Sequence, residues 1–110
     1  MIFAYDEWNR EHVGKHGVNR IDAEYVVENA AAPYPQRIER GKFIVYGPDC
    51  AGRIIEVVFA FRTADRVDFE SLDLSQLEEL TQKADAVAVY IIHAMPIAGR
   101  TKKRYRRRRR

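Results

Sequence analysis

The hydrophobic and polar positions in the first part of the chain repeat with a helical period. Residues 1–5 (MIFAY) form a short apolar segment, which we interpret as an edge strand or a buried lead-in. Asp6 predicts the N-cap of a helix over residues 7–15, because its carboxylate can accept hydrogen bonds from the first turn. Trp8 is the expected core anchor of this helix. Gly17 is expected to end it by adopting the left-handed conformation.

A second helix is predicted to begin after Asn19, which is a favourable N-cap residue. Ile21, Tyr25 and Val26 trace the narrow stripe that this helix is expected to bury. The segment 30–35 (AAAPYP) ends the helix, because proline has no N–H group to continue the hydrogen-bond ladder.

The pattern then changes from helical to strand-like. Residues 36–40 and 42–46 are two candidate strands separated by Gly41. After a turn rich in glycine and proline, residues 53–62 (RIIEVVFAFR) form the strongest candidate strand. Their almost continuous apolar character favours a central strand that is covered on both faces. Residues 86–94 (AVAVYIIHA) predict another apolar strand.

A short helix is predicted between the last two strands, after a polar loop. Ser75 and Glu78 have the spacing of a capping box, which indicates a helix over residues 76–84. Leu77 and Leu80 are expected to point inward from it.

The C-terminal end changes character again. Residues 97–105 predict a basic helix, and residues 106–110 are five arginines whose mutual repulsion favours a disordered tail. The elements together predict an α+β fold, in which two N-terminal helices pack on a small antiparallel β-sheet that a basic C-terminal helix follows. We assign residues 1–105 to a single domain.

Composition agrees with a globular protein and narrows its setting. A chain of 110 residues is long enough to bury a core without disulfides. Cys50 is the only cysteine, so it has no intramolecular partner and indicates no oxidising compartment. The sequence has no apolar run of membrane-spanning length and no signal-peptide pattern. We therefore expect a cytoplasmic protein without membrane attachment, cofactor or metal.

Charge is strongly separated along the chain. Residues 1–99 contain ten Lys and Arg against sixteen Asp and Glu, a formal charge of −6. Residues 100–110 contain nine Lys and Arg and no acid, a formal charge of +9. An acidic body with a basic end favours contact with a polyanion, and RNA is the polyanion we expect.

Two histidine positions are candidates for chemistry. Lys15 and His16 stand together at a predicted helix end, where they could bind phosphate or move a proton, although cations there also simply stabilise the helix. His12 and His16 have an i, i+4 spacing but no third ligand, so a metal site is not predicted. His93 lies near the end of the last strand, where it could be catalytic or structural.

The segment from Arg100 to Arg106 has the strongest binding signal. Guanidinium groups bind phosphate through two hydrogen bonds, and the release of counterions makes such binding sensitive to salt. Tyr105 is set among arginines and could stack on a base in single-stranded RNA. The alternatives are a solvated tail that aids solubility and a tail that binds an acidic protein.

Three stretches together resemble a known family. They are FAYDEWNREHVGKHGV (residues 3–18), the strand pair KFIVYG and RIIEVVFAF, and IIHAMPIAGRTKKRY (residues 91–105). In order and spacing they resemble the BrnT family of bacterial toxins, which are RelE-like ribonucleases of type II toxin–antitoxin modules. The stretches span most of the chain and leave residues 63–85 uncovered.

The resemblance implies a metal-independent endoribonuclease that cleaves RNA by attack of the ribose 2′-hydroxyl on the adjacent phosphate. It places Lys15 and His16 near the substrate and Arg100 on the scissile phosphate. His93 is added as a catalytic candidate from its position alone. The resemblance further implies a BrnA-like antitoxin as partner and a contact with the ribosome. The residues implied to hold the RNA are Lys102, Lys103, Arg104 and Tyr105.

Two other classes of function remain open at this point. The first is a non-catalytic RNA- or ribosome-binding module with the same fold, which is favoured by Met95 and Gly99 at positions where the family commonly has arginine. The second is a protein-interaction domain whose arginine-rich tail recognises an acidic partner.

Overall fold

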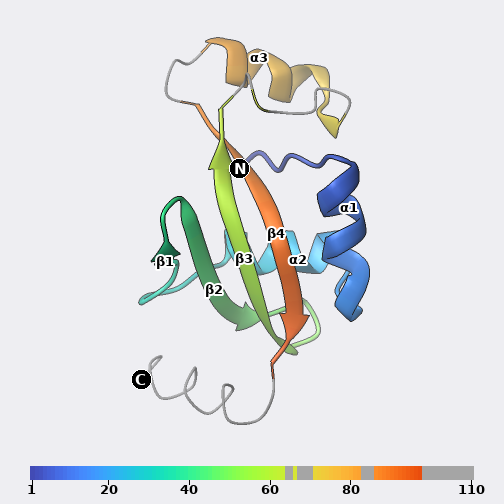
Figure 1. Cartoon of the computed structure of the whole chain (residues 1–110), viewed down its shortest axis with the longest axis vertical. Coiled ribbons are helices and arrows are strands. Elements are labelled where there is room, and N and C mark those ends of the chain that lie inside the picture. Colours follow the sequence, from blue (N-terminus) through green and yellow to red (C-terminus); the bar gives the residue numbers. More distant parts are fainter. Residues whose placement is uncertain (64–65, 67–70, 83–85, 98–110) are drawn as a thin grey trace.

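The computed structural model describes residues 1–63, 66, 71–82 and 86–97, so most of the predicted basic helix and all of the tail lie outside the described residues. The described part is α+β, with three α-helices, one short 3-10 helix and a four-stranded antiparallel open sheet. None of these helices is long and apolar enough to cross a membrane. In chain order the elements are α1 (Glu7–Val13), η1 (Gly14–His16), α2 (Arg20–Glu28), β1 (Gln36–Glu39), β2 (Lys42–Pro48), β3 (Ile54–Arg62), α3 (Leu74–Gln82) and β4 (Ala88–Pro96) (Figure 1).

The sheet follows the chain in the order β1-β2-β3-β4, so each strand pairs with its neighbour in sequence. The N-terminal segment adds a further pairing at the outer edge of β4, where Phe3 and Val89 form an isolated parallel bridge. The Ala4 N–H donates to the Val89 carbonyl at 2.9 Å, and the Val89 N–H donates to the Ile2 carbonyl at 2.7 Å. Residues 2–5 are also buried, so this segment is both paired at the sheet edge and part of the core.

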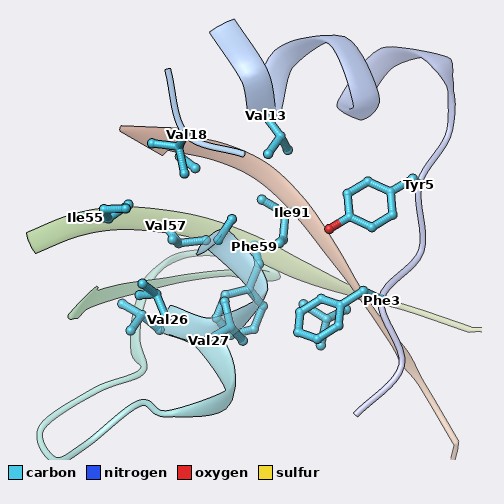
Figure 2. Packing of buried hydrophobic residues seen from close by; sticks show 14 of the residues in the cluster. Phe3, Tyr5, Val13, Val18, Val26, Val27, Ile55, Val57, Phe59 and Ile91 are labelled. Carbon is cyan, nitrogen blue, oxygen red and sulfur yellow. The ribbon is translucent and has the colours of Figure 1, made fainter. Parts of the chain in front are cut away.

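One face of the sheet packs against α2, which passes behind the strands in Figure 1. Figure 2 shows Val26 and Val27 of α2 against side chains of β3. Burial alternates over the first part of β3, which differs from the prediction of a strand covered on both faces. Ile55, Val57 and Phe59 are buried and the residues between them are half-buried, whereas Ala60 is also buried and Phe61 is exposed. The fully buried members of this core cluster include Val18, Ala23, Val26, Val45, Ile55, Val57, Ile91 and Ala94.

Helix α1 begins at the predicted residue, but Trp8 is not its core anchor. Trp8 is 46% exposed and stacks on the ring of His12, with the ring centroids 3.8 Å apart. Asn9 and Val13 are the buried residues of the helix. The orientation follows from the cap, because the Asp6 carboxylate accepts from the Asn9 N–H and the Asn9 side chain accepts from the Asp6 N–H.

Helix α2 begins after Asn19 as predicted, with the Asn19 side chain accepting from the Asp22 N–H. The predicted buried stripe was wrong for Ile21, which is 71% exposed, and for Tyr25. The helix instead turns a small residue, Ala23, towards the sheet together with Val26 and Val27. A small residue on this face allows the helix backbone to come close to the strands, and Gly47 of β2 accommodates the Val26 side chain.

Helix α3 forms a second, smaller cluster at the far end of the sheet. The predicted capping box of Ser75 and Glu78 is wrong. The Asp73 side chain accepts from the Gln76 N–H, and the Gln76 side chain accepts from the Asp73 N–H, so the helix begins earlier than predicted. Leu80 is buried as predicted and Leu77 is half-buried against the same cluster. The buried members of the cluster are Ile2, Ala4, Leu72, Leu80 and Ala88.

Strand β4 contains a β-bulge that the alternating pattern did not reveal. His93 pairs with Val58, and Ile91 pairs with the next residue of β3, Phe59, so Ile92 is an extra residue in β4. Since side chains in a strand alternate between faces, one extra residue exchanges the faces of everything beyond it. The strand also runs to Pro96, two residues beyond the predicted end.

Asn9 joins α1 to the outer edge of β4 beside this bulge. Its side-chain amide donates to the Ala4 carbonyl and the Ile91 carbonyl, both at 3.1 Å, and Asn9 is completely buried. The side chain therefore continues the edge pairing of β4 where the N-terminal segment leaves the strand.

We predict that Asn9→Ala lowers the free energy of unfolding by about 3 kcal/mol, because it leaves buried carbonyl groups without hydrogen-bond donors. Chemical denaturation followed by circular dichroism measures the change. Asn29→Ala is the matched control: the Asn29 amide also donates to a carbonyl, that of Tyr25, but at an exposed helix end. This control is expected to cost less than about 1 kcal/mol. Equal losses for the two variants would contradict the assigned role of Asn9.

Candidate active site

The bulge in β4 places polar side chains on the face of the sheet that is opposite α2. Along β3, Glu56 and Val58 alternate with core residues, and the buried Ala60 and half-buried Arg62 continue on the same side of the strand. Tyr90 of β4 pairs with Ala60 and His93 with Val58, so Tyr90 and His93 belong to this same face although they are three residues apart. We call the residues of β3 and β4 on this side the outer face: Glu56, Val58, Ala60, Arg62, Tyr90, His93 and Met95.

His16 and His93 are brought together although they are 77 positions apart in the sequence numbering. Their ring centroids are 5.2 Å apart and the ring planes meet at 69°, an edge-on contact. His16 is exposed at the end of η1, and His93 is half-buried on β4. Gly17 follows with a φ of 77°, the predicted left-handed conformation, and its N–H donates to the Gly14 carbonyl.

The turn between β2 and β3 supports the loop that carries His16. Asp49 is buried and accepts hydrogen bonds from the backbone N–H groups of Ala51 and Arg53. The Arg53 side chain pairs with the Asp49 carboxylate at 3.2 Å and also donates to the Gly17 carbonyl at 3.5 Å. The residue after His16 is therefore tied to the rigid turn of the hairpin. Neither Asp49 nor Arg53 was a candidate from the sequence, and Cys50 is an exposed turn residue, as expected.

The environment of His93 favours its neutral form. Burial lowers the pKa of His93 below its ordinary value of 6.5, and the nearby His16 acts in the same direction. The Glu56 carboxylate acts in the opposite direction, because it stabilises the imidazolium. A half-buried neutral imidazole beside an exposed second imidazole can accept a proton while its neighbour supplies one.

The other N-terminal candidates point elsewhere. Lys15 is exposed and lines a shallow hollow with Glu11, His12 and Gly14. The His12 ring nitrogen Nδ1 is 2.8 Å from the Trp8 carbonyl oxygen, in addition to its stacking contact. His12 and His16 therefore make contacts with different partners. His16, and not Lys15, contacts His93.

The tail candidates cannot be placed. Arg100, Lys102, Lys103, Arg104 and Tyr105 lie outside the described residues. The described chain leaves β4 at Pro96, only three residues after His93.

The sequence reasoning missed a group of three side chains, two of which, Arg62 and Tyr90, belong to the outer face. The Tyr90 hydroxyl lies 2.9 Å from both carboxylate oxygens of Asp6, the N-cap of α1. The Arg62 guanidinium lies over the Tyr90 ring, 4.7 Å from its centroid. No local signal could have found this group, because it depends on the bulge and on the position of α1 beside β4.

The protonation states of this group are well defined. Burial and the hydrogen bond to Asp6 raise the pKa of Tyr90 to about 12, so the hydroxyl remains a donor at neutral pH. Partial burial opposes ionisation of Asp6, but hydrogen bonds from Asn9 and Tyr90 lower its pKa below the ordinary value. Asp6 is therefore an anion that holds Tyr90 in place.

Comparison with known proteins adds no relative: no family model, curated protein or solved structure matches this chain.

We predict that His93 titrates below pH 6.5, as measured by NMR of its ring protons. His16→Ala is expected to raise the pKa of His93, because it removes the neighbouring imidazole that lowers this pKa, and Glu56→Gln is expected to lower the pKa further. His12→Ala is the control and should leave the His93 titration unchanged. A rise in the pKa of His93 in the Glu56→Gln variant would contradict the assigned geometry.

The lowered pKa of His93 also predicts how the stability of the fold depends on pH. A histidine whose pKa is lower in the folded state favours folding most above its unfolded pKa, near 6.5. This contribution is expected to fall as the pH drops below 6.5 towards the folded-state pKa of His93. Denaturation at a series of pH values should show a smaller fall for His93→Gln than for the unchanged protein.

Proposed function

We propose that the protein is a metal-independent endoribonuclease in which His16 and His93 act as an acid–base pair. The observation that carries the proposal is the edge-on contact of these two imidazoles on the outer face, with ring centroids 5.2 Å apart. They come from distant parts of the chain, and the surroundings of His93 favour a base. RNA is the substrate that fits the charge separation, because a +9 segment begins at residue 100.

The chemistry follows from the roles assigned to the two imidazoles. Neutral His93 accepts the proton of the ribose 2′-hydroxyl, and the 2′-oxygen forms a bond to the adjacent phosphorus. The bond from phosphorus to the 5′-oxygen breaks, and His16, in the role of general acid, donates a proton to that leaving oxygen. The products are a 2′,3′-cyclic phosphate and a 5′-hydroxyl. Glu56 stabilises the imidazolium that His93 becomes during the reaction.

The C-terminal residues complete the proposal. Arg100 is assigned to the scissile phosphate, and Lys102, Lys103, Arg104 and Tyr105 to binding of the flanking RNA. Strand β4 ends at Pro96, three residues after His93. This short separation is consistent with a basic segment near the two histidines. Lys15 is assigned to RNA contact rather than to proton transfer, because it is exposed on the side of η1 that faces His12.

The biological setting is proposed from the sequence resemblance to BrnT toxins. The protein would be the toxin of a type II module with a RelE-like fold, and a BrnA-like antitoxin would cover its basic surface. The α+β architecture with an antiparallel sheet is consistent with this assignment.

A second function, a non-catalytic RNA- or ribosome-binding module, is favoured by one observation. Met95 belongs to the outer face and pairs with Glu56, so the position commonly occupied by arginine in the family carries no charge next to the histidines. The two functions share RNA binding and differ in whether the RNA is cut.

We predict that His93→Ala and His16→Ala each reduce cleavage of an RNA oligonucleotide at least about a hundredfold, because each removes one proton-transfer partner. Gel analysis of the products in the presence of EDTA measures the rate and excludes metal-dependent contaminants. His12→Ala is the matched control. This substitution is expected to leave the cleavage rate unchanged, because His12 stacks on Trp8.

Growth on induced expression provides the cellular readout. The unchanged protein is expected to arrest growth, and His93→Ala and Arg100→Ala to relieve the arrest. RNA binding without cleavage by the unchanged protein would exclude the nuclease and support the second function.

A further inference from the structure

The outer face carries a second built feature beside the histidine pair, formed by Arg62, Tyr90 and Asp6. Arg62 lies over the Tyr90 ring, and the Tyr90 hydroxyl donates to the Asp6 carboxylate. Asp6 in turn caps α1 and accepts from the Asn9 N–H. The position of the Arg62 guanidinium is therefore supported through a chain of contacts that reaches the folded core.

The strand register places the Arg62–Tyr90 pair close to His93 on the same face of the sheet. Tyr90 pairs with Ala60, and His93 pairs with Val58, so the two rows are two residues apart on β3. Two residues of a strand span about 7 Å. A nucleic-acid chain that crosses His93 would thus meet the Arg62–Tyr90 pair at a neighbouring position along its backbone.

Two other cations on or next to the sheet, Lys42 and Arg53, are already paired with acids. Lys42, which pairs with Ala60 and so lies in the row of Tyr90, is 2.8 Å from the Glu39 carboxylate, and Arg53 is 3.2 Å from the Asp49 carboxylate. Within the described part of the chain, the Arg62 guanidinium lies over the Tyr90 ring and donates from Nη1 to the Phe61 carbonyl at 3.3 Å. A guanidinium that stacks through its flat face keeps in-plane N–H donors for a phosphate.

From this geometry we infer that Arg62 is a positioning residue that binds the phosphate next to the scissile one, with Tyr90 as its platform. The inference rests on the proposed ribonuclease function for the identity of the substrate, a single-stranded RNA. The ligand chemistry itself is a phosphodiester bound by a stacked guanidinium. Arg62 does not touch the reacting atoms, so it should act on substrate binding and not on the chemical step.

The test measures binding and cleavage separately in full-length variants. Binding uses a 2′-O-methylated RNA oligonucleotide, which cannot be cut by 2′-hydroxyl attack, and fluorescence anisotropy over a series of salt concentrations. Arg62→Ala is expected to weaken binding about tenfold and to reduce the salt slope by about one phosphate contact. Arg62→Lys should restore the salt slope but not the full affinity, because the lysine ammonium cannot stack on the Tyr90 ring or bind a phosphate through two parallel hydrogen bonds.

Two further variants test the platform. Tyr90→Phe keeps the ring under Arg62 but removes the hydroxyl that donates to Asp6, so it is expected to weaken RNA binding less than Tyr90→Leu does. Tyr90→Leu removes the ring and should resemble Arg62→Ala. Arg37→Ala on the exposed strand β1 is the matched control, because it removes an arginine elsewhere on the sheet. Thermal unfolding of each variant separates loss of binding from loss of folding.

Cleavage kinetics distinguish this inference from the proposed function. Arg62→Ala should raise KM about tenfold with little change in kcat. If the unchanged protein cuts RNA but Arg62→Ala behaves like Arg37→Ala in both assays, the inference fails and the nuclease stands. If the unchanged protein binds the methylated RNA through Arg62 but cuts no RNA, the nuclease fails and the binding role stands. Absence of RNA binding by the unchanged protein overturns both.

Discussion

The extra residue in β4 is the constraint on which the outer face depends. Ile92 separates two registers, so Ile91 and Ala94 both enter the core although they are three positions apart, and Tyr90 and His93 both leave it. A bulge weakens the ladder locally and needs support from outside the strand. The Asn9 side chain provides that support at the Ile91 carbonyl, the residue before the bulge. Asn9 thereby connects the N-cap of α1 to the β-bulge in β4.

The same contacts that stabilise the fold also organise the candidate site. Asp6 caps α1 and holds the Tyr90 hydroxyl, so the start of the first helix and the middle of the last strand share one carboxylate. Asp49 shapes the turn between β2 and β3 and orients Arg53 towards the Gly17 carbonyl. Both acids are local turn or cap residues in the sequence. Asp6 reaches a side chain of β4 directly, and Asp49 acts on the loop after η1 through Arg53. Preorganisation of this kind keeps polar groups in place without requiring the substrate to order them.

Local interactions explain which parts of the fold were predictable. The Asp6 cap, the left-handed Gly17 and the start of α2 each depend on residues within one turn, so short-range reasoning placed them correctly. The order of helices and strands followed from the change of period after residue 35. The direction in which a helix faces was less predictable. Ile21 is apolar but 71% exposed, because α2 turns Ala23, Val26 and Val27 towards the sheet.

For the candidate site, the sequence alone determined that His16 stands at a glycine-ended turn, that His93 stands near the end of an apolar strand, and that a basic segment follows. It could not determine the face of His93. Strict alternation groups His93 with Val89 and Ile91, which are buried, and only the bulge moves it to the opposite side. The contact with His16, the influence of Glu56 and the Arg62–Tyr90–Asp6 group then follow from pairing between strands. These are interactions between residues that are far apart in sequence, so they exist only in the tertiary structure.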